Sequence, residues 1–105
     1  MANAYISGTG FFVPERIVTN DDLSKYMDTT NEWIIERTGI HERRYVTGEI
    51  GPAELAKNAS EMALEDAGLT VHDIDFIIFA TSTPDFYAPG SGCVLQEMMG
   101  FNTIG

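Results

Sequence analysis

Residues 76–80, Phe-Ile-Ile-Phe-Ala, form a continuously apolar run that constrains the fold more than any other segment. A strand without alternation between apolar and polar residues is typical of a strand buried on both faces, as in parallel sheets covered by helices on each side. The chain also offers helical patterns before and after this run. We therefore predict an α/β fold with a mixed sheet flanked by helices.

Two helices are expected around this strand. Pro52 suits a first helical position and Gly68 a helix end, which predicts a helix over residues 52–67. Its apolar residues recur at helical spacing and are mostly small, which implies close packing on a sheet; they are Leu55, Ala59, Met62, Ala63 and Ala67. A further helix is expected over residues 91–99.

The other expected elements are short. We predict a strand over residues 4–9, an edge strand over 43–47 and a turn over 48–51. A short helix over residues 21–26 would carry two aspartates at its positive end, where negative charge is favourable.

Residues 28–44 contain the pattern of a capped helix from about Thr30 to Thr38. Thr29 is expected to be its N-cap, in a capping box with Glu32, and Gly39 is expected to close it in a left-handed conformation. Trp33 and Arg37 are four residues apart and therefore share one face. An adenine ring could stack on the indole while the guanidinium meets a phosphate. From these residues alone, a simple packing pair with a solvated cation is the more common reason for this spacing.

The sequence of this helix resembles a family signature. Residues 28–43, Asp-Thr-Thr-Asn-Glu-Trp-Ile-Ile-Glu-Arg-Thr-Gly-Ile-His-Glu-Arg, are similar to that of β-ketoacyl-acyl-carrier-protein synthase III, a thiolase-fold family that condenses an acyl-CoA primer with malonyl-acyl-carrier protein. Residues 6–23 resemble the opening strand and first helix of the family, and residues 74–81 resemble its third strand. The resemblance covers essentially the whole chain.

This resemblance implies that residues 1–105 are the N-terminal part of a layered α/β/α thiolase-like domain of an enzyme that starts fatty acid synthesis. The segment would end before the strand-to-helix turn that carries the nucleophilic cysteine. No catalytic residue is then expected in this chain, which is predicted to be inactive alone. Thr29, Trp33 and Arg37 match the positions that contact the adenine and phosphates of CoA, a substrate rather than a cofactor. His41 stands where better-known members have an arginine.

The loop after the apolar run carries two candidate residues, Phe86 and Tyr87, between Pro84 and Pro89. Loops at the carboxyl ends of strands are where α/β folds bind ligands. In the resembling family, a bulky residue of this loop closes the acyl pocket of the partner subunit in a homodimer. Because this chain has one extra residue in the loop, both aromatics are candidates. The alternative is that both cap the local core.

Two alternative functions remain open. The first is another condensing enzyme of the thiolase superfamily, acting on long-chain acyl-CoA or in polyketide synthesis. The second is a non-catalytic module that binds CoA or dimerises. The expected partners are acyl-CoA, a second copy of the chain and acyl-carrier protein. The carrier protein is acidic, like this chain with its net charge of −10, so it would dock on the absent portion.

Several other site types are argued against by the sequence. The net charge of −10 does not suit nucleic acid, which is bound by clustered cations. The Gly-Thr-Gly at residues 8–10 lacks the third glycine of a dinucleotide fingerprint. His41, His72 and Cys93 lack metal-site spacing, and the two histidines are expected at the surface. Cys93 is predicted to pack as a small apolar residue.

Location is predicted from the same features. No apolar run reaches membrane-spanning length, and the first residues lack the pattern of a secretory signal. A single cysteine cannot form an internal disulfide, which suits a reducing compartment. We therefore expect a cytoplasmic protein.

Overall fold

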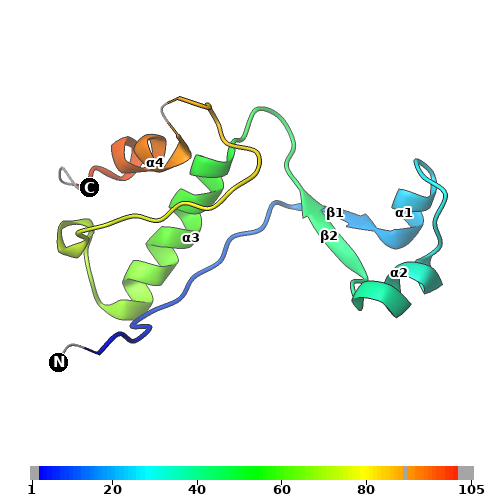
Figure 1. Ribbon diagram of the computed structural model, residues 1–105, viewed down its shortest axis with the longest axis horizontal. Helices are drawn as coiled ribbons and strands as arrows, with labels where there is room; N and C mark the ends of the chain where they lie inside the picture. The colour runs from blue at the N-terminus through cyan, green and yellow to red at the C-terminus, as the bar shows by residue number, and fades with distance from the viewer. Residues whose placement is uncertain (1–2, 89, 102–105) are drawn as a thin grey trace. The chain divides into compact units, whose positions relative to one another are not determined.

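The computed structural model describes residues 3–88 and 90–101 of the chain. These residues belong to two compact units (Figure 1). One unit is Val13–Glu49, and the other, larger unit is Met1–Phe12 with Ile50–Gly105. The expectation that residues 1–105 belong to one thiolase-like domain stays a prediction.

The Val13–Glu49 unit contains an antiparallel pair of strands, β1 (Arg16–Thr19) and β2 (Glu42–Tyr45), and two helices between them (Figure 1). The pairing runs from Arg16 opposite Tyr45 to Thr19 opposite Glu42. The edge strand predicted over 43–47 is confirmed, although it begins one residue earlier and ends two residues earlier than predicted. Strand β1 was not predicted, because its two apolar residues are adjacent and give no alternation.

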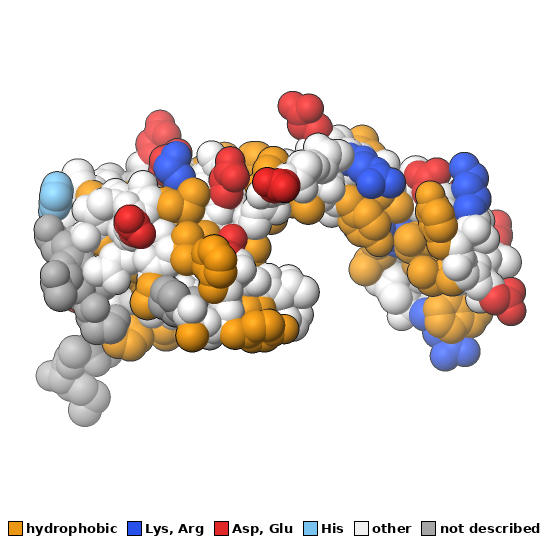
Figure 2. Space-filling model, turned by 90° about the horizontal axis from the view of Figure 1, so that it is seen from above, with side chains coloured by type: hydrophobic (Ala, Val, Ile, Leu, Met, Phe, Trp, Pro, Cys, Tyr) orange, Lys and Arg blue, Asp and Glu red, His pale blue; other side chains and the backbone are white. Residues whose placement is uncertain are grey.

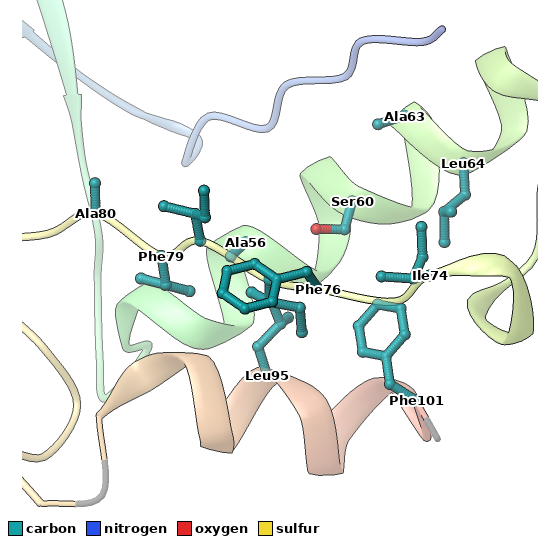
Figure 3. Close-up of a pocket in the computed structure, with 12 residues that line it drawn as sticks. Ala56, Ser60, Ala63, Leu64, Ile74, Phe76, Phe79, Ala80, Leu95 and Phe101 are labelled. Carbon is teal, nitrogen blue, oxygen red and sulfur yellow. The ribbon is translucent and has the colours of Figure 1, made fainter. Parts of the chain in front are cut away.

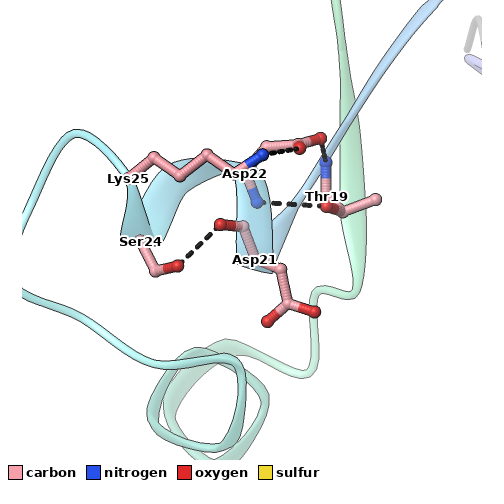
Figure 4. A network of polar contacts seen from close by, with 5 residues as sticks. All are labelled: Thr19, Asp21, Asp22, Ser24 and Lys25. Carbon is pink, nitrogen blue, oxygen red and sulfur yellow. Dashed lines mark hydrogen bonds and ion pairs between the residues drawn. The ribbon is translucent and has the colours of Figure 1, made fainter.

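Helix α1 (Asn20–Ser24) begins with a capping box (Figure 4). The Thr19 hydroxyl accepts the Asp22 backbone N–H over 3.1 Å, and the Asp22 carboxylate accepts the Thr19 N–H over 2.9 Å. The predicted pair of aspartates in the first turn is confirmed, and the helix ends two residues earlier than predicted. The cap fixes where β1 stops and α1 starts.

Helix α2 (Asn31–Thr38) is confirmed, but its expected N-cap is wrong. Thr30, not Thr29, caps the helix, since its hydroxyl accepts the backbone N–H of Trp33 over 3.1 Å. The capping box between Thr29 and Glu32 therefore does not form. At the other end, Gly39 has a φ of 71° and closes the helix as expected, because glycine adopts this left-handed conformation without a steric penalty.

The larger unit contains helix α3 (Pro52–Ala67), a short 3₁₀ helix η1 (Val71–Asp73) and helix α4 (Ser91–Met99). Both predicted α-helices are confirmed, with a proline in the first turn of α3 and a left-handed Gly68 at its end. Helix η1 was not predicted. Helices α3 and α4 pack against each other, and Ala53 and Leu95 supply the buried apolar residues of this unit.

The strand predicted over residues 4–9 is wrong, because the described part of the larger unit contains no strand with which it could form a ladder. The segment instead lies against α3. A Cβ added to Gly8 would lie 2.6 Å from the Ala63 carbonyl oxygen and 2.7 Å from the Ala67 Cβ. The Thr9 N–H also donates to Asp66 Oδ2 over 3.0 Å. The small face of α3 thus permits close approach, as expected, but of an irregular segment rather than a sheet.

The strand predicted over residues 76–80 is also wrong for the described residues, since this segment has no regular secondary structure. Its burial on both faces is absent as well, because Phe76 is 64% exposed and Ile78 is 87% exposed. Apolar side chains are visible at the surface of each unit (Figure 2). The mixture of helices and strands agrees with the predicted α/β class, although the sheet of the described residues has only two strands.

Candidate functional site

Trp33 and Arg37 lie on one face of α2, as their spacing predicts. The guanidinium carbon of Arg37 is 5.3 Å from the centroid of the Trp33 ring, within cation–π range. Trp33 remains 53% exposed, and Arg37 is exposed. Within the described parts of the chain, Arg37 has no carboxylate partner. The pair therefore presents an accessible aromatic surface next to a cation that no acidic side chain neutralises.

Thr29 precedes the helix cap and is the third residue predicted for this site. Its hydroxyl oxygen is buried and has no hydrogen-bond partner among the described residues. A buried hydroxyl without a partner loses the hydrogen bonds it would make with water, so it is a good site for a hydrogen bond from a ligand or another segment. The expectation that capping occupies this hydroxyl is thus corrected, because Thr30 performs that role.

Asn20 fixes α2 relative to the strands, and sequence reasoning missed it. Its side chain is 1% exposed. The amide nitrogen donates to Asn31 Oδ1 over 2.9 Å and to the Ile40 carbonyl over 2.8 Å. The amide oxygen accepts from Arg43 over 2.6 Å. One buried amide therefore joins both ends of α2 to β2.

The loop after residue 80 is anchored by Asp85, whose carboxylate accepts hydrogen bonds from the Ala53 N–H over 3.0 Å and from the Ser91 hydroxyl over 2.7 Å. The next two residues project outward, with Phe86 60% and Tyr87 96% exposed. Neither aromatic caps the local core, which was one of the two expectations for them. This loop belongs to the larger unit, whereas Thr29, Trp33 and Arg37 belong to the Val13–Glu49 unit.

An apolar cavity of about 400 Å³ lies in the larger unit, within the usual size range of ligand sites (Figure 3). Its lining comes from α3, from Ile74 and residues 76–80, and from α4 with Phe101. Ser60 supplies the one side-chain hydroxyl, and no lining residue is charged. This composition suits an apolar covering segment and offers no group for acid–base or nucleophilic chemistry.

The remaining candidates carry no constellation of reactive groups. Across residues 3–88 and 90–101, no group of three His, Cys, Asp or Glu side chains could hold a metal ion. His41 and His72 are exposed, as expected. Cys93 is exposed, so the packing role predicted for it is not observed. Among the same residues, no helix is long and apolar enough to cross a membrane.

Curated relatives match this chain closely over most of its length. A β-ketoacyl-[acyl-carrier-protein] synthase III from Bacillus anthracis is 52% identical over 98 residues, which are 93% of this chain and 32% of that protein. A protein of the same name from Xanthomonas euvesicatoria is 47% identical over 95 residues, 90% of this chain and 29% of its own length. The chain thus spans about a third of the relatives it matches. No family model matches it.

Solved structures show the same fold. The 3-oxoacyl-[acyl-carrier-protein] synthase III of Aquifex aeolicus aligns with a TM-score of 0.84 at 39% identity, covering 94% of this chain and 32% of that one. The priming β-ketosynthase of the R1128 polyketide pathway aligns with a TM-score of 0.85 at 31% identity, covering 95% of this chain and 30% of its own. The described residues therefore have the fold of a segment of these thiolase-like proteins, which confirms the predicted fold class.

Proposed function

We propose that this chain is part of an acyltransferase that condenses acyl-CoA with malonyl-acyl-carrier protein to start fatty acid synthesis. The ground is that the chain matches part of the β-ketoacyl-[acyl-carrier-protein] synthase III family in sequence and in fold. The observation that carries this proposal is the open Trp33–Arg37 pair of α2. An exposed indole beside an unpaired guanidinium matches the two ends of a CoA head group, a flat base and its phosphates.

Each residue of the pair would contribute a distinct interaction. The indole of Trp33 offers a surface on which adenine can stack. Such stacking requires only the flat face of the base and that of the indole. The guanidinium N–H groups of Arg37 would donate hydrogen bonds to a phosphate, whether or not Arg37 keeps its contact with the Trp33 ring. Thr29 would give its unpartnered hydroxyl to the same ligand. CoA acts here as part of the substrate, and no separate cofactor is proposed.

The chemical step would use residues outside this chain. The acyl group would pass from the sulfur of CoA to a cysteine thiolate, which releases CoA as a thiolate and keeps the number of thioester bonds unchanged. Cys93 is not proposed as that cysteine, because its thiol is exposed and makes no hydrogen bond to a histidine among the described residues. The 105-residue chain alone is therefore proposed to be inactive.

A homodimer is proposed from the loop anchored by Asp85. Phe86 and Tyr87 are exposed on a loop that is held by part-buried hydrogen bonds of Asp85, an arrangement suited to contact with a second copy. Acyl-carrier protein is proposed to bind elsewhere, since the chain's net charge of −10 would repel an acidic partner. The cytoplasmic location expected from the sequence remains a prediction.

One alternative is favoured by a specific observation. The R1128 priming β-ketosynthase matches the chain at a TM-score of 0.85, as high as the Aquifex aeolicus protein. A primer-specific condensing enzyme of polyketide type would use the same CoA site and differ in its acyl pocket. The extra residue of the loop around Phe86 would then alter primer choice.

The test is a segment exchange with the Bacillus anthracis relative. The 98 matching residues of that protein are replaced by those of this chain, and CoA release is followed with acetyl-CoA and malonyl-acyl-carrier protein. The proposal predicts an active chimera and no release above background by the 105-residue chain. A folded but inactive chimera, or turnover by the chain alone, would contradict it. A polyketide-type role predicts an active chimera that prefers a primer other than acetyl-CoA.

A further inference from the structure

The Val13–Glu49 unit contains a second cavity, which neither Trp33 nor Arg37 lines. It has a volume of about 350 Å³, room for about a dozen molecules of water at their liquid volume. Its walls come from β1, from Tyr45 on β2 and from α1 with the turn after it. The residues are Arg16, Ile17, Val18, Asp22, Leu23, Lys25, Tyr26, Met27 and Tyr45.

Arg16 is the notable polar group of this cavity. Its guanidinium carbon lies 5.8 Å from the ring centroid of Tyr45, the residue opposite it on β2. Within the described residues, no guanidinium N–H of Arg16 donates to a protein acceptor, and no carboxylate forms an ion pair with Arg16. A guanidinium held over a ring keeps the donors on its edge free for a planar anion.

The charges of the lining do not cancel. Arg16 and Lys25 are cations, and Asp22 is the one acid. The Asp22 carboxylate already accepts the Thr19 N–H over 2.9 Å and lies 3.6 Å from the Lys25 ammonium (Figure 4). The lining therefore carries one uncompensated positive charge, at the guanidinium of Arg16.

The rest of the lining is apolar. Ile17, Leu23 and Met27 supply aliphatic and thioether surface, and two tyrosines supply aromatic surface. Tyr26 is 78% exposed and Met27 54% exposed, so part of this apolar surface meets water. Covering it with a ligand would be favourable, by roughly 25 cal/mol for each Å² removed from water. The excess positive charge and the apolar surface of the lining therefore fit one kind of ligand, an amphiphile with a single negative charge.

We propose that this cavity is a binding site for a short fatty acid or a similar organic monoanion. The carboxylate would receive two parallel hydrogen bonds from the edge of the Arg16 guanidinium, and the hydrocarbon would lie along Ile17 and Leu23. A carboxylate fits better than a phosphate ester, because its single charge equals the excess charge of the lining. The site is separate from the residues proposed for CoA and does not depend on them.

Equilibrium dialysis of the 105-residue chain with radiolabelled octanoate tests the proposal, because it works whatever the association state of the chain. Saturable binding is expected, and unlabelled octanol should not compete. Arg16→Gln, which keeps the length of the side chain but removes its charge, should weaken octanoate binding by at least about tenfold, as for loss of hydrogen bonds to a charged group. Arg16→Lys should bind with intermediate affinity, because the ammonium keeps the charge but not the planar fork.

Arg44→Gln is the matched control. It removes an arginine of the same unit that does not line the cavity, and it should leave octanoate affinity unchanged. The proposal is overturned if octanoate does not bind saturably, if octanol competes as well as octanoate, or if Arg16→Gln and Arg44→Gln have equal effects. The last two results would mean that octanoate binds to exposed apolar surface in general.

Discussion

The Ser91 hydroxyl donates a hydrogen bond to Asp85 Oδ2 over 2.7 Å, and the backbone N–H of Asp85 donates one to Ser91 Oγ over 2.9 Å. The same carboxylate oxygen accepts the N–H of Ala53, one of the donors that the first turn of a helix leaves without a partner. One aspartate therefore joins the starts of α3 and α4 and holds the loop that carries Phe86 and Tyr87.

Asp85→Ala is expected to destabilise the N-termini of α3 and α4. Ala53 is 1% and Ser91 3% exposed, so each would keep a buried polar group without its partner, at about 1–3 kcal/mol per group. The backbone amide of Ala53 should then exchange with deuterium faster. Asp75→Ala is the control, because Asp75 is exposed and makes no hydrogen bond or ion pair with the described residues. Unchanged exchange at Ala53 would show that the carboxylate does not hold the helix.

Asn20→Ala is expected to lower the free energy of unfolding of the Val13–Glu49 unit more than a substitution at the surface does. It removes three hydrogen bonds of a side chain that is 1% exposed and leaves Arg43 and Asn31 without their partner. The expected cost is about 1–3 kcal/mol or more. Trp33 fluorescence during urea titration reports this cost. Asn58→Ala is the control, because it removes only an exposed hydrogen bond to the Glu54 carbonyl in the other unit. Equal midpoints for the two variants would contradict this role.

Asp22 should make the start of α1 sensitive to acid. The backbone N–H of Thr19, more than its hydroxyl and the Lys25 ammonium, holds the pKa of the Asp22 carboxyl below its ordinary value of 3.8. A lowered folded-state pKa gives stabilisation that is complete above the ordinary value and lost as the pH falls through the folded-state pKa. The Thr19 amide proton shift should therefore titrate below pH 3.8. Asp22→Asn should abolish this titration and Asp21→Asn should keep it; a midpoint at or above the ordinary value would contradict the cap.

The 105-residue chain is expected to associate when it is expressed alone. Val18, Ile34, Ala53 and Leu95 are the apolar side chains buried in the described residues, whereas Ile78 is 87% exposed. Exposed apolar surface of this kind recruits other chains. Sedimentation velocity should show oligomers or aggregates. A monodisperse monomer with a sharp melting transition would favour the reading of the chain as an independent module.

Local signals in the sequence were sufficient to predict the positions of the longer helices. Pro52 and Gly68 bound α3, and Gly39 ends α2, because their backbone preferences act within one turn. Two consecutive threonines made the start of α2 ambiguous, since both are good caps. The structure selects Thr30, whose hydroxyl reaches the Trp33 N–H.

Features that depend on distant residues could not be predicted. A strand requires a neighbour, and the expected strands over 4–9 and 76–80 have none in the described residues. Asn20 and Asp85 were missed because their partners lie up to 23 and 32 positions away along the chain. For the site, the i, i+4 spacing predicted that Trp33 and Arg37 meet, while the free hydroxyl of Thr29 followed only from the observed cap.

Calorimetric CoA affinity of the chimeric enzyme tests the central claim most directly. Trp33→Ala should weaken CoA by about 1–3 kcal/mol, the usual range for stacking of a base on an aromatic side chain. Arg37→Ala should weaken CoA more than dephospho-CoA if it meets the ribose phosphate, and both equally if it meets the pyrophosphate. Tyr5→Ala and Arg44→Ala remove an exposed aromatic and a cation elsewhere and should change neither affinity. Unchanged CoA affinity in both Trp33→Ala and Arg37→Ala would contradict the proposed site.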